Sequence, residues 1–442
     1  MAQAKELTQA MIRKTLSYRY AVYAVVALAY FLVYFHRTST AVMAPDLVTA
    51  FGIAPTAIGL FGSMYFYAYA IGQLPAGILA DRWGARKTMS IFIIVAGVGA
   101  ILFGRAGSFN TALVARFMVG LGVGFIYVPA MRILADWFKK DEFATYTGIL
   151  VAVGNAGSLA SSAPLVALMA AIGWRSSMTS VGIVSLVVAV ILYMFVRNKP
   201  TDVGGASIAD IQGIPISSPT PIGIGAGLGI VVRTYNVWTI AVMFFVWYGT
   251  IMGFQGLWAG PYLMNVYHLT KVEAGNILMI IPIGLIFGCP IAGIIADKWI
   301  KSKKKVLMMG ATLNILTWIP LVFMIDSMSL SFIRVLLLVY GFFGGFYVVL
   351  FANVKENIDL RIAGTTIGFV NVFGFVGGAI YQQIMAGLIQ APVTNNIIAT
   401  SGFKSAFGLC LVTLVIALAF FATQKENIGT LSFKNTVKGN RY

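Results

Sequence analysis

Long apolar stretches separated by short polar loops run through almost the whole chain. A helix needs about 20 mainly apolar residues to cross about 30 Å of hydrocarbon, and each of these stretches is long enough. The pattern therefore predicts an all-α membrane protein with twelve transmembrane helices. We expect these helices at residues 19–46, 54–80, 88–106, 110–136, 143–172, 176–197, 236–266, 272–296, 305–326, 329–354, 363–391 and 402–423.

A polar interval at residues 198–235 separates the first six predicted helices from the last six. Its prolines, together with nearby Gly and Ser, indicate an irregular cytoplasmic linker. Alternate glycines at 223–229 resemble a phosphate-binding loop, but no strand precedes them and no Lys-Ser/Thr follows, so we interpret them as a flexible hinge. The expected parts are an N-terminal segment (1–18), two helical bundles (19–197 and 236–423) around the linker, and a tail (424–442).

A repeat divides the chain into two related halves. Residues Gly72–Lys87 (GQLPAGILADRWGARK) return as Gly288–Lys303 (GCPIAGIIADKWIKSK), with Asp81 matched by Asp297 and Arg82 by Lys298. In each copy small residues end an apolar helix, an acid follows, and cations come within a turn. Such small residues let a neighbouring backbone approach closely, and the cations suit an anionic membrane surface. A repeat of this length indicates a duplicated half.

The composition supports a polytopic membrane protein. Hydrophobic residues make up 59% of the chain and charged residues 10%, with a mean hydropathy of +0.88, whereas soluble domains carry about 25% charged residues. Cys289 and Cys410 lie inside apolar runs, where we expect them to pack in the core. The first residues lack a short apolar core with a cleavage site, so we expect the first membrane helix to direct insertion.

The net charge of +17 arises from loops on one side of the membrane. Most of the 31 Lys and Arg residues fall in alternate loops, which the positive-inside rule places in the cytoplasm together with both termini. We therefore expect a multi-pass protein of the plasma (inner) membrane. No basic stretch carries interleaved aromatic residues, which argues against nucleic-acid binding. The cations on the other side are Arg105, Arg175, Lys271, Arg334 and Lys404.

The repeated loop resembles the signature loop of the major facilitator superfamily, which lies between the second and third helices and recurs in weaker form between the eighth and ninth. The second copy here lacks the equivalent of Gly84. Membership implies two pseudo-symmetric six-helix bundles, a central site at the midplane, and alternating access by rocking of the bundles. It implies no cofactor or metal. The residues expected to form gates are Asp81, Arg82, Arg86, Asp136, Asp297 and Lys298.

Arg37 is the most informative charge. The apolar stretch from Ala21 to Phe35 gives about 22 Å of helix, too short to cross alone, so Arg37 must lie within the membrane. A charged side chain there costs about 2.5–3.5 kcal/mol unless it faces a polar cavity or a partner. Tyr30, Tyr34 and Thr38 share its helical face, which we expect to line the path. The alternatives for Arg37 are snorkelling to the interface and pairing with a neighbour.

Two further arginines lie on the fourth predicted helix. The 15 residues between Arg116 and Arg132 are too few to span the membrane, so at least one of the two is buried in it. Arg116 resembles the helix-4 arginine of the superfamily, which acts there in coupling. Arg132 either contacts substrate or pairs with Asp136 one turn on. Gly120 and Gly124 form a smooth strip for close helix packing.

Other polar residues are weaker candidates. His36 and Asp46 are considered for coupling, because a histidine titrates near neutral pH and Asp46 is the acid nearest the cavity. Since successive helical residues point about 100° apart, His36 could also face a neighbouring helix. Packing is the alternative for each remaining substrate candidate, and these candidates are Asn155, Gln255, Trp258 and Asn371, with Tyr347 and Asn353 weaker.

Two short stretches, Tyr34–Ala41 (YFHRTSTA) and Ala135–Thr145 (ADWFKKDEFAT), resemble the organic-anion branches of the superfamily, the anion:cation symporters and organophosphate antiporters. There the helix-1 arginine contacts the anion. Two departures matter. His36 and Val123 stand where proton-coupled members carry acids, and the second half has no arginine inside the membrane, since Arg334 is counted on the outer side. One positive centre suits a small organic acid better than a phosphate ester.

The sequence therefore predicts a secondary active or facilitative transporter of a small carboxylate-type anion. An exporter of drugs, metabolites or siderophore-like molecules is the first alternative, suggested by aromatic residues such as Tyr65, Tyr69 and Trp247. A non-transporting ligand sensor is the second. No nucleophile, base and orienting group occur together, so we do not expect an enzyme. The expected partners are the anion, protons if transport is coupled, and the bilayer, with the protein a monomer.

Overall fold

The computed structural model describes residues 8–212, 224–358, 363–390 and 399–425. Every regular element in these residues is helical, as predicted. Ten of the described helical stretches are long and apolar enough to cross a membrane. Helices α3 and α7 supply the two other expected spans. The first half contains α1 (Gln9–Thr38), α2 (Thr40–Phe51), α3 (Pro55–Arg82), α4 (Ala85–Gly104), α5 (Phe109–Gly124), α6 (Tyr127–Trp137), α7 (Lys140–Ala160) and α8 (Ala163–Phe195).

The second half repeats this layout with more interruptions. Two of its spans contain π-helical segments, η2 and η3, and a third contains the 3₁₀ segment η4. Its elements are α11 (Tyr235–Gly253), η2 (Phe254–Trp258), α12 (Ala259–Val266), α13 (Lys271–Leu278), α14 (Ile280–Ile294), η3 (Ile295–Trp299), α15 (Lys303–Phe323), α16 (Leu330–Gly344), η4 (Gly345–Val348), α17 (Val349–Asn357), α18 (Ala363–Gln390) and α19 (Thr400–Ala422).

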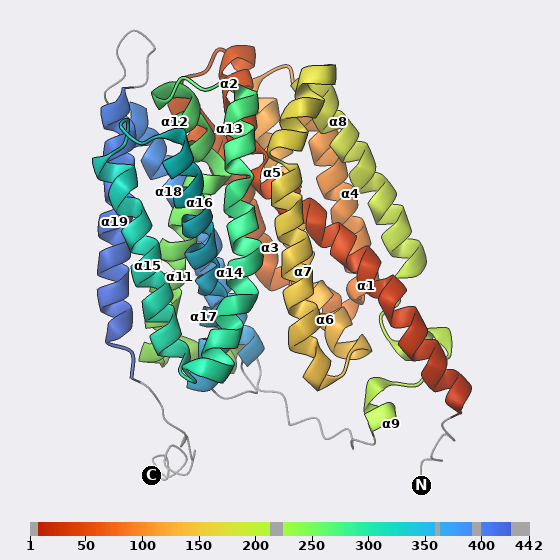
Figure 1. Ribbon diagram of the computed structural model, residues 1–442. Coiled ribbons are helices and arrows are strands. Elements are labelled where there is room, and N and C mark those ends of the chain that lie inside the picture. The colour runs from red at the N-terminus through yellow and green to blue at the C-terminus, as the bar shows by residue number, and fades with distance from the viewer. Residues whose placement is uncertain (1–7, 213–223, 359–362, 391–398, 426–442) are drawn as a thin grey trace.

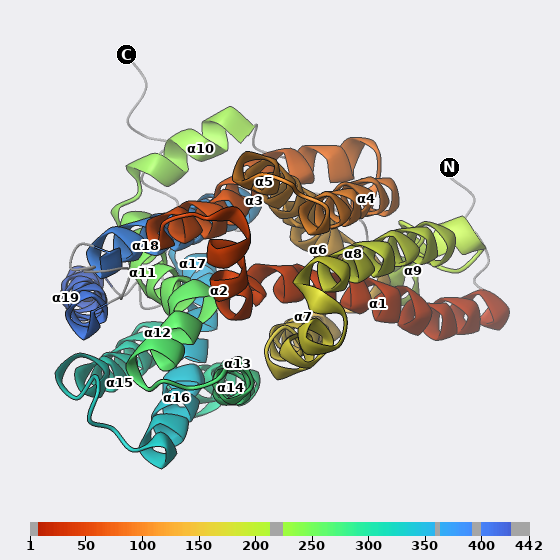
Figure 2. The same ribbon diagram turned by 90° about the horizontal axis from the view of Figure 1, so that it is seen from above.

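The two halves form two groups of helices side by side (Figure 2). Helix α1 begins and α19 ends at the same end of the bundle, the lower end in Figure 1, which we call the terminal face; the opposite end is the distal face. Gly173, with φ 77°, turns the chain between the fifth and sixth spans. The architecture is the two-bundle arrangement that the repeat predicted.

The first, fourth, seventh and tenth spans are interrupted along their length. The first span changes from α1 to α2 at Ser39, and the fourth from α5 to α6 after Gly124. The seventh passes through η2 and the tenth through η4. Such breaks free backbone carbonyls and amides inside the membrane, which neighbouring groups must satisfy.

The linker is more ordered than expected. It contains the short helices η1 (Pro200–Val203), α9 (Ile208–Gln212) and α10 (Ile224–Arg233). Gly225, Gly227 and Gly229 lie within α10, so the prediction of an irregular hinge at these glycines was wrong. Gly223, Pro215, Pro219 and Pro221 lie outside the described residues. The helix forms because α10 packs against α18 and its Val231 is fully buried.

The start of the linker folds onto the first half. The Thr15 hydroxyl donates to the Ala206 carbonyl at 2.8 Å, and the Tyr18 hydroxyl donates to the Phe195 carbonyl at 2.7 Å. These contacts explain why α1 begins at Gln9, ten residues before the expected boundary at residue 19.

The halves meet along α3 and α18. The Ser63 hydroxyl of α3 donates to the Ala379 carbonyl of α18 at 2.7 Å, and near the distal face Gly260 and Gly275 lie against backbone of the other half, at Ala41 and Ala163. These backbone contacts join the halves near the distal face. A Cβ added to Gly148 of α7, Gly293 of α14 or Gly368 of α18 would have nothing within 4 Å, so no neighbour packs closely on these three glycines.

The predicted glycine strip on the fourth span is confirmed. A Cβ on Gly120 would overlap the backbone of Tyr65, and one on Gly124 would lie 3.1 Å from the backbone of Tyr69, both on α3. These two glycines therefore let α5 approach α3 closely, as small residues do between membrane helices.

We predict that Gly120→Ala lowers the melting temperature of the purified protein. The added methyl group would force α5 and α3 apart, and overpacking of this kind costs about 1–3 kcal/mol. Gly148→Ala is the matched control, because its methyl group would enter open space. Thermal unfolding in detergent measures both variants, and equal melting temperatures would contradict the packing role of Gly120.

Candidate substrate-binding site

Arg37 lies in the last turn of α1, directly before the break at Ser39, and is 2% exposed. Its guanidinium carbon lies 4.2 Å from the centre of the Tyr34 ring and 5.3 Å from the centres of the Tyr69 and Phe375 rings. Within the described residues no Asp or Glu forms an ion pair with it. The predicted burial of Arg37 without a carboxylate is therefore what the structure shows.

Aromatic rings from both halves surround this guanidinium. Tyr69 of α3 packs on Phe375 of α18 with ring centres 4.0 Å apart. Tyr248 of α11 lies 5.4 Å from Phe375 and 5.5 Å from Tyr347 of η4. We call Tyr34, Tyr69, Phe375, Tyr248 and Tyr347 the Arg37 enclosure. Cation–π contacts of this kind contribute up to about 2 kcal/mol each when desolvated.

The first-half side of the enclosure continues along α1. Tyr30 packs on Tyr34 at 5.2 Å and on Tyr127 of α6 at 5.8 Å. Tyr127 and Tyr248 were not among the sequence candidates. Tyr248 lies seven residues before Gln255 on the same helical face, a spacing that could have identified it.

Arg116 supports the break in the first span. It is 2% exposed, its Nη1 donates to the His36 carbonyl at 2.9 Å, and its guanidinium lies 4.8 Å from the Tyr65 ring. The His36 carbonyl belongs to the last turn of α1, where backbone acceptors lose their helical partners. Arg116 therefore has a structural role next to the Arg37 enclosure: it satisfies a backbone carbonyl at the end of α1.

Thr38 and Asn155 bond locally. The Thr38 hydroxyl donates to the Tyr34 carbonyl at 3.0 Å and lies 2.7 Å from the Ser161 hydroxyl, while Asn155 donates from Nδ2 to the Val151 carbonyl at 3.0 Å. Both side chains thus have protein partners where α1 packs on α7. Their roles in substrate binding stay predictions.

The second-half candidates occupy three different places. Gln255 lies in η2, and its buried Oε1 has no partner. Trp258 donates from Nε1 to the Gln382 carbonyl at 3.1 Å, so its indole N–H is already hydrogen-bonded to α18. Asn371 donates to Gln73 Oε1 at 3.4 Å and thereby joins α18 to α3.

The coupling candidates lie away from the enclosure. The His36 ring is fully buried, with Nε2 3.5 Å from the Ser185 hydroxyl of α8, so it faces a helix of its own bundle. Asp46 of α2 forms an ion pair with Lys271 of α13. This pair joins the two halves at the distal face. Both coupling roles stay predictions.

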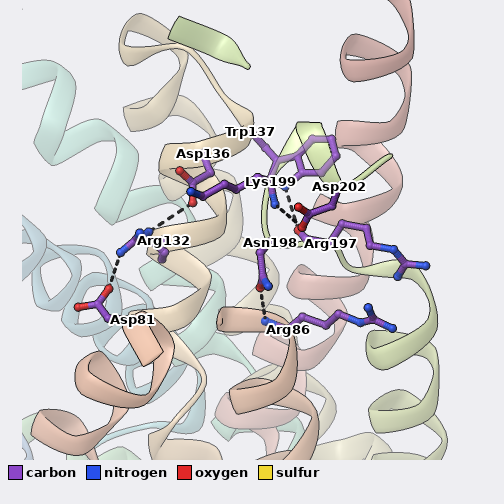
Figure 3. A network of polar contacts seen from close by, with 9 residues as sticks. All are labelled: Asp81, Arg86, Arg132, Asp136, Trp137, Arg197, Asn198, Lys199 and Asp202. Carbon is purple, nitrogen blue, oxygen red and sulfur yellow. Dashed lines mark hydrogen bonds and ion pairs between the residues drawn. The ribbon is translucent and has the colours of Figure 1, made fainter. Parts of the chain in front are cut away.

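Arg132 lies on α6 and points toward Asp81, the acid at the end of α3 (Figure 3). Its side chain is 47% exposed and forms ion pairs with Asp81 and, at 3.3 Å, with Asp136. Of the two arginines on the fourth span, Arg116 is therefore the buried one, whereas Arg132 is held by two carboxylates at the rim of the first half. Of its two predicted roles, the geometry favours the pair with Asp136.

The signature loop forms one wall of a cleft of about 280 Å³ at this rim. Gly84 adopts φ 82°, and a Cβ there would overlap Asn198, whose Oδ1 accepts from the Arg86 backbone N–H at 2.9 Å. Exposed Arg82 also lines the cleft.

The second copy of the loop is built differently. Asp297 pairs with Lys303 at 2.6 Å, Lys298 is exposed, and Lys301 takes the positive φ of 54°. The missing glycine therefore changes which residue makes the turn.

Comparison with known proteins identifies one family. The model of the Major Facilitator Superfamily matches residues 26–381. The chain is 24% identical over 391 residues to a Cupriavidus necator protein named "Probable sulfoacetate transporter SauU", covering 86% of this chain and 89% of that protein. It is 25% identical to the hexuronate transporter of Bacillus subtilis, covering 88% and 89%.

Two further relatives broaden the range of functions. A Chlamydia pneumoniae protein named "Probable hexose phosphate transport protein" is 25% identical over 95% of both chains. The membrane sensor protein UhpC of Salmonella typhimurium is 22% identical over 82% of this chain and 84% of its own length. None of these four relatives is named as an enzyme, in agreement with the prediction.

Among solved structures, a bacterial homologue of the human lysosomal transporter Spinster, crystallised inward-facing and unoccupied, superposes with a TM-score of 0.71. It is 19% identical in sequence, and the match covers 91% of this chain and 96% of that one. At this identity the likeness establishes the fold alone.

We predict that Lys271→Ala loosens the distal face. The pair with Asp46 is partly exposed and contributes at most about 1 kcal/mol, so its loss shifts the equilibrium between closed and open forms by up to about fivefold. A cysteine replacing buried Ala41, labelled by an impermeant maleimide, measures the opening. Lys404→Ala, which removes an exposed cation from the start of α19, is the control. Equal labelling rates in the Lys271→Ala and Lys404→Ala variants would contradict a role of the Asp46–Lys271 pair in closing the distal face.

Proposed function

The chain belongs to the Major Facilitator Superfamily, and from this premise we propose that it transports a small organic anion by alternating access, with Arg37 as the counter-ion. The observation that carries the proposal is a guanidinium that is 2% exposed, lies between the two halves, and has no carboxylate partner in the described chain. A buried cation of this kind is costly unless an anion or water reaches it.

The charge balance favours one anionic group. In the described part of the chain the buried charged side chains are Arg19, Arg37 and Arg116, all in the first half. Arg19 pairs with Glu142 at 2.7 Å and Arg116 donates to the His36 carbonyl. Arg37 is left to bind a carboxylate or sulfonate, whose oxygens accept charge-assisted hydrogen bonds.

The relatives support an anion and leave its type open. Their names include a sulfoacetate, a hexuronate and a hexose phosphate transporter. A phosphate ester carries close to two charges, and the second half supplies no buried cation in the residues described. We therefore favour a carboxylate or sulfonate over a sugar phosphate.

The orientation follows from the loop charges. We propose that the terminal face is cytoplasmic and that both termini lie there, because the basic loops cluster on that side. The protein then resides in the plasma (inner) membrane, with Asp46 and Lys271 on the outer side and the Arg132 network on the inner side.

A ligand sensor is the second candidate, because one relative is named a membrane sensor. The exporter alternative has less support. Among the aromatic residues that suggested it, Tyr65 donates to the Val33 carbonyl and Trp247 is fully buried. Trp258 likewise donates to the Gln382 carbonyl. These side chains are therefore parts of the helix packing.

We predict that Arg37→Ala reduces uptake at least tenfold. A hydrogen bond to a charged group contributes about 1.5–3 kcal/mol, and 1.4 kcal/mol corresponds to a factor of ten. Uptake of glucuronate, sulfoacetate and glucose 6-phosphate into proteoliposomes measures the loss, with Arg37→Lys expected to retain part of the activity.

Arg334→Ala is the control, since it removes an exposed arginine from α16. Wild-type uptake by Arg37→Ala would refute the counter-ion role. Binding of a probe by the wild type without any uptake would favour the sensor.

We predict that His36→Gln leaves the dependence of uptake on a pH gradient unchanged, because the ring faces Ser185 inside the first bundle. Uptake is measured with an inward-directed proton gradient, with and without an uncoupler. If the wild type responds to the gradient and the variant does not, His36 carries the proton after all.

A further inference from the structure

Tyr248 carries a buried hydroxyl that no protein group satisfies. Its side chain is 2% exposed, and its oxygen has no hydrogen-bond partner. A buried hydroxyl without a partner costs about 1–3 kcal/mol, so its presence calls for an explanation. The buried hydroxyls of Tyr65 and Tyr381 do have partners, the Val33 carbonyl and the Thr413 hydroxyl. The Tyr340 hydroxyl also lacks one, but its ring packs on Phe254 and Trp318 inside the second half.

The ring of Tyr248 is fixed by its own half. It packs on Phe244 at 5.1 Å, on Tyr347 at 5.5 Å and on Phe375 at 5.4 Å. Three aromatic neighbours leave the ring little freedom to turn its hydroxyl towards another protein acceptor. The free hydroxyl is therefore a fixed feature of the second half.

The same Phe375 ring also contacts Arg37, at 5.3 Å from the guanidinium carbon. Phe375 is thus a shared neighbour of the cation of the first half and the phenol of the second. The Nε of Arg37 is likewise buried without a partner. Two unsatisfied hydrogen-bond donors from different halves therefore border one aromatic ring.

A guanidinium only donates hydrogen bonds, and a phenol hydroxyl donates readily. A group that satisfies both needs at least two acceptor oxygens and a negative charge. A carboxylate or a sulfonate meets this requirement. The hydrogen bond from a neutral phenol adds no second positive charge, which matches a group with a single charge.

We propose that the anionic group of the substrate bridges Arg37 of the first half and the Tyr248 hydroxyl of the second half. This inference rests on the proposed function and names the residue through which the second half takes part in anion binding. A bound anion then links the two bundles directly, so its binding energy depends on the relative position of both.

The test compares Tyr248→Phe with Tyr381→Phe in the full-length purified protein. Each variant loses one hydroxyl, but that of Tyr381 is already bonded to Thr413. Affinity for glucuronate, sulfoacetate and glucose 6-phosphate is measured by isothermal titration calorimetry. We expect Tyr248→Phe to weaken binding of the preferred probe about tenfold and Tyr381→Phe to leave it unchanged.

Thermal unfolding supplies a readout that a purely structural role would not give. Without ligand, Tyr248→Phe should melt at or above the wild-type temperature, because it removes an unsatisfied buried hydroxyl. With ligand, its stabilisation should be smaller than that of the wild type. A ligand-free melting temperature below that of the wild type would show that the hydroxyl has a structural partner and overturn the proposal.

The two proposals fail in different ways. If the wild type binds none of the three probes, the proposed function fails, and this inference with it. If Arg37→Ala abolishes binding while Tyr248→Phe binds like the wild type, only the bridging role of Tyr248 is refuted.

Discussion

The desolvation of one guanidinium is the constraint on which the centre of this protein depends. Arg37 is held away from lipid and loop water without a carboxylate partner in the described residues. Aromatic faces lower the cost, since their quadrupoles attract a cation, but they do not replace the hydrogen bonds that a guanidinium makes in water. The aromatic contacts therefore offset part of the cost of burying Arg37 without ligand. An anion that enters the site can accept the hydrogen bonds that the protein does not accept from the guanidinium.

The break in the first span places this charge. Arg37 lies in the last turn of α1, directly before the point where α1 gives way to α2, and Arg116 donates to the His36 carbonyl there. One arginine thus maintains the backbone geometry that presents the other. This division of work explains how two buried cations can lie in the same bundle while only one is left for a ligand.

The sequence predicted the architecture well, because span length, repeat and loop charge depend on local composition. It also predicted the burial of Arg37, since the preceding apolar stretch is too short to cross the membrane. It left the place of Arg132 open because one of the two carboxylates that hold it at the rim, Asp81, is 51 positions away in the chain. Tyr248 was missed because the face that a helix turns inward is decided by packing between the halves.

The ion pairs show how binding at the centre can be transmitted to the two faces. Asp46 and Lys271 join the halves at the distal face, whereas Arg132 binds Asp81 and Asp136 within the first half. Closure at the terminal face therefore has no equivalent ion pair across the halves among the contacts described, and must be stabilised by something else. An anion held by Arg37 on one side and by Tyr248 on the other would supply that stabilisation at mid-depth. It would draw the bundles together below the distal contacts, and the weak, partly exposed pair at the distal face could then open at little cost.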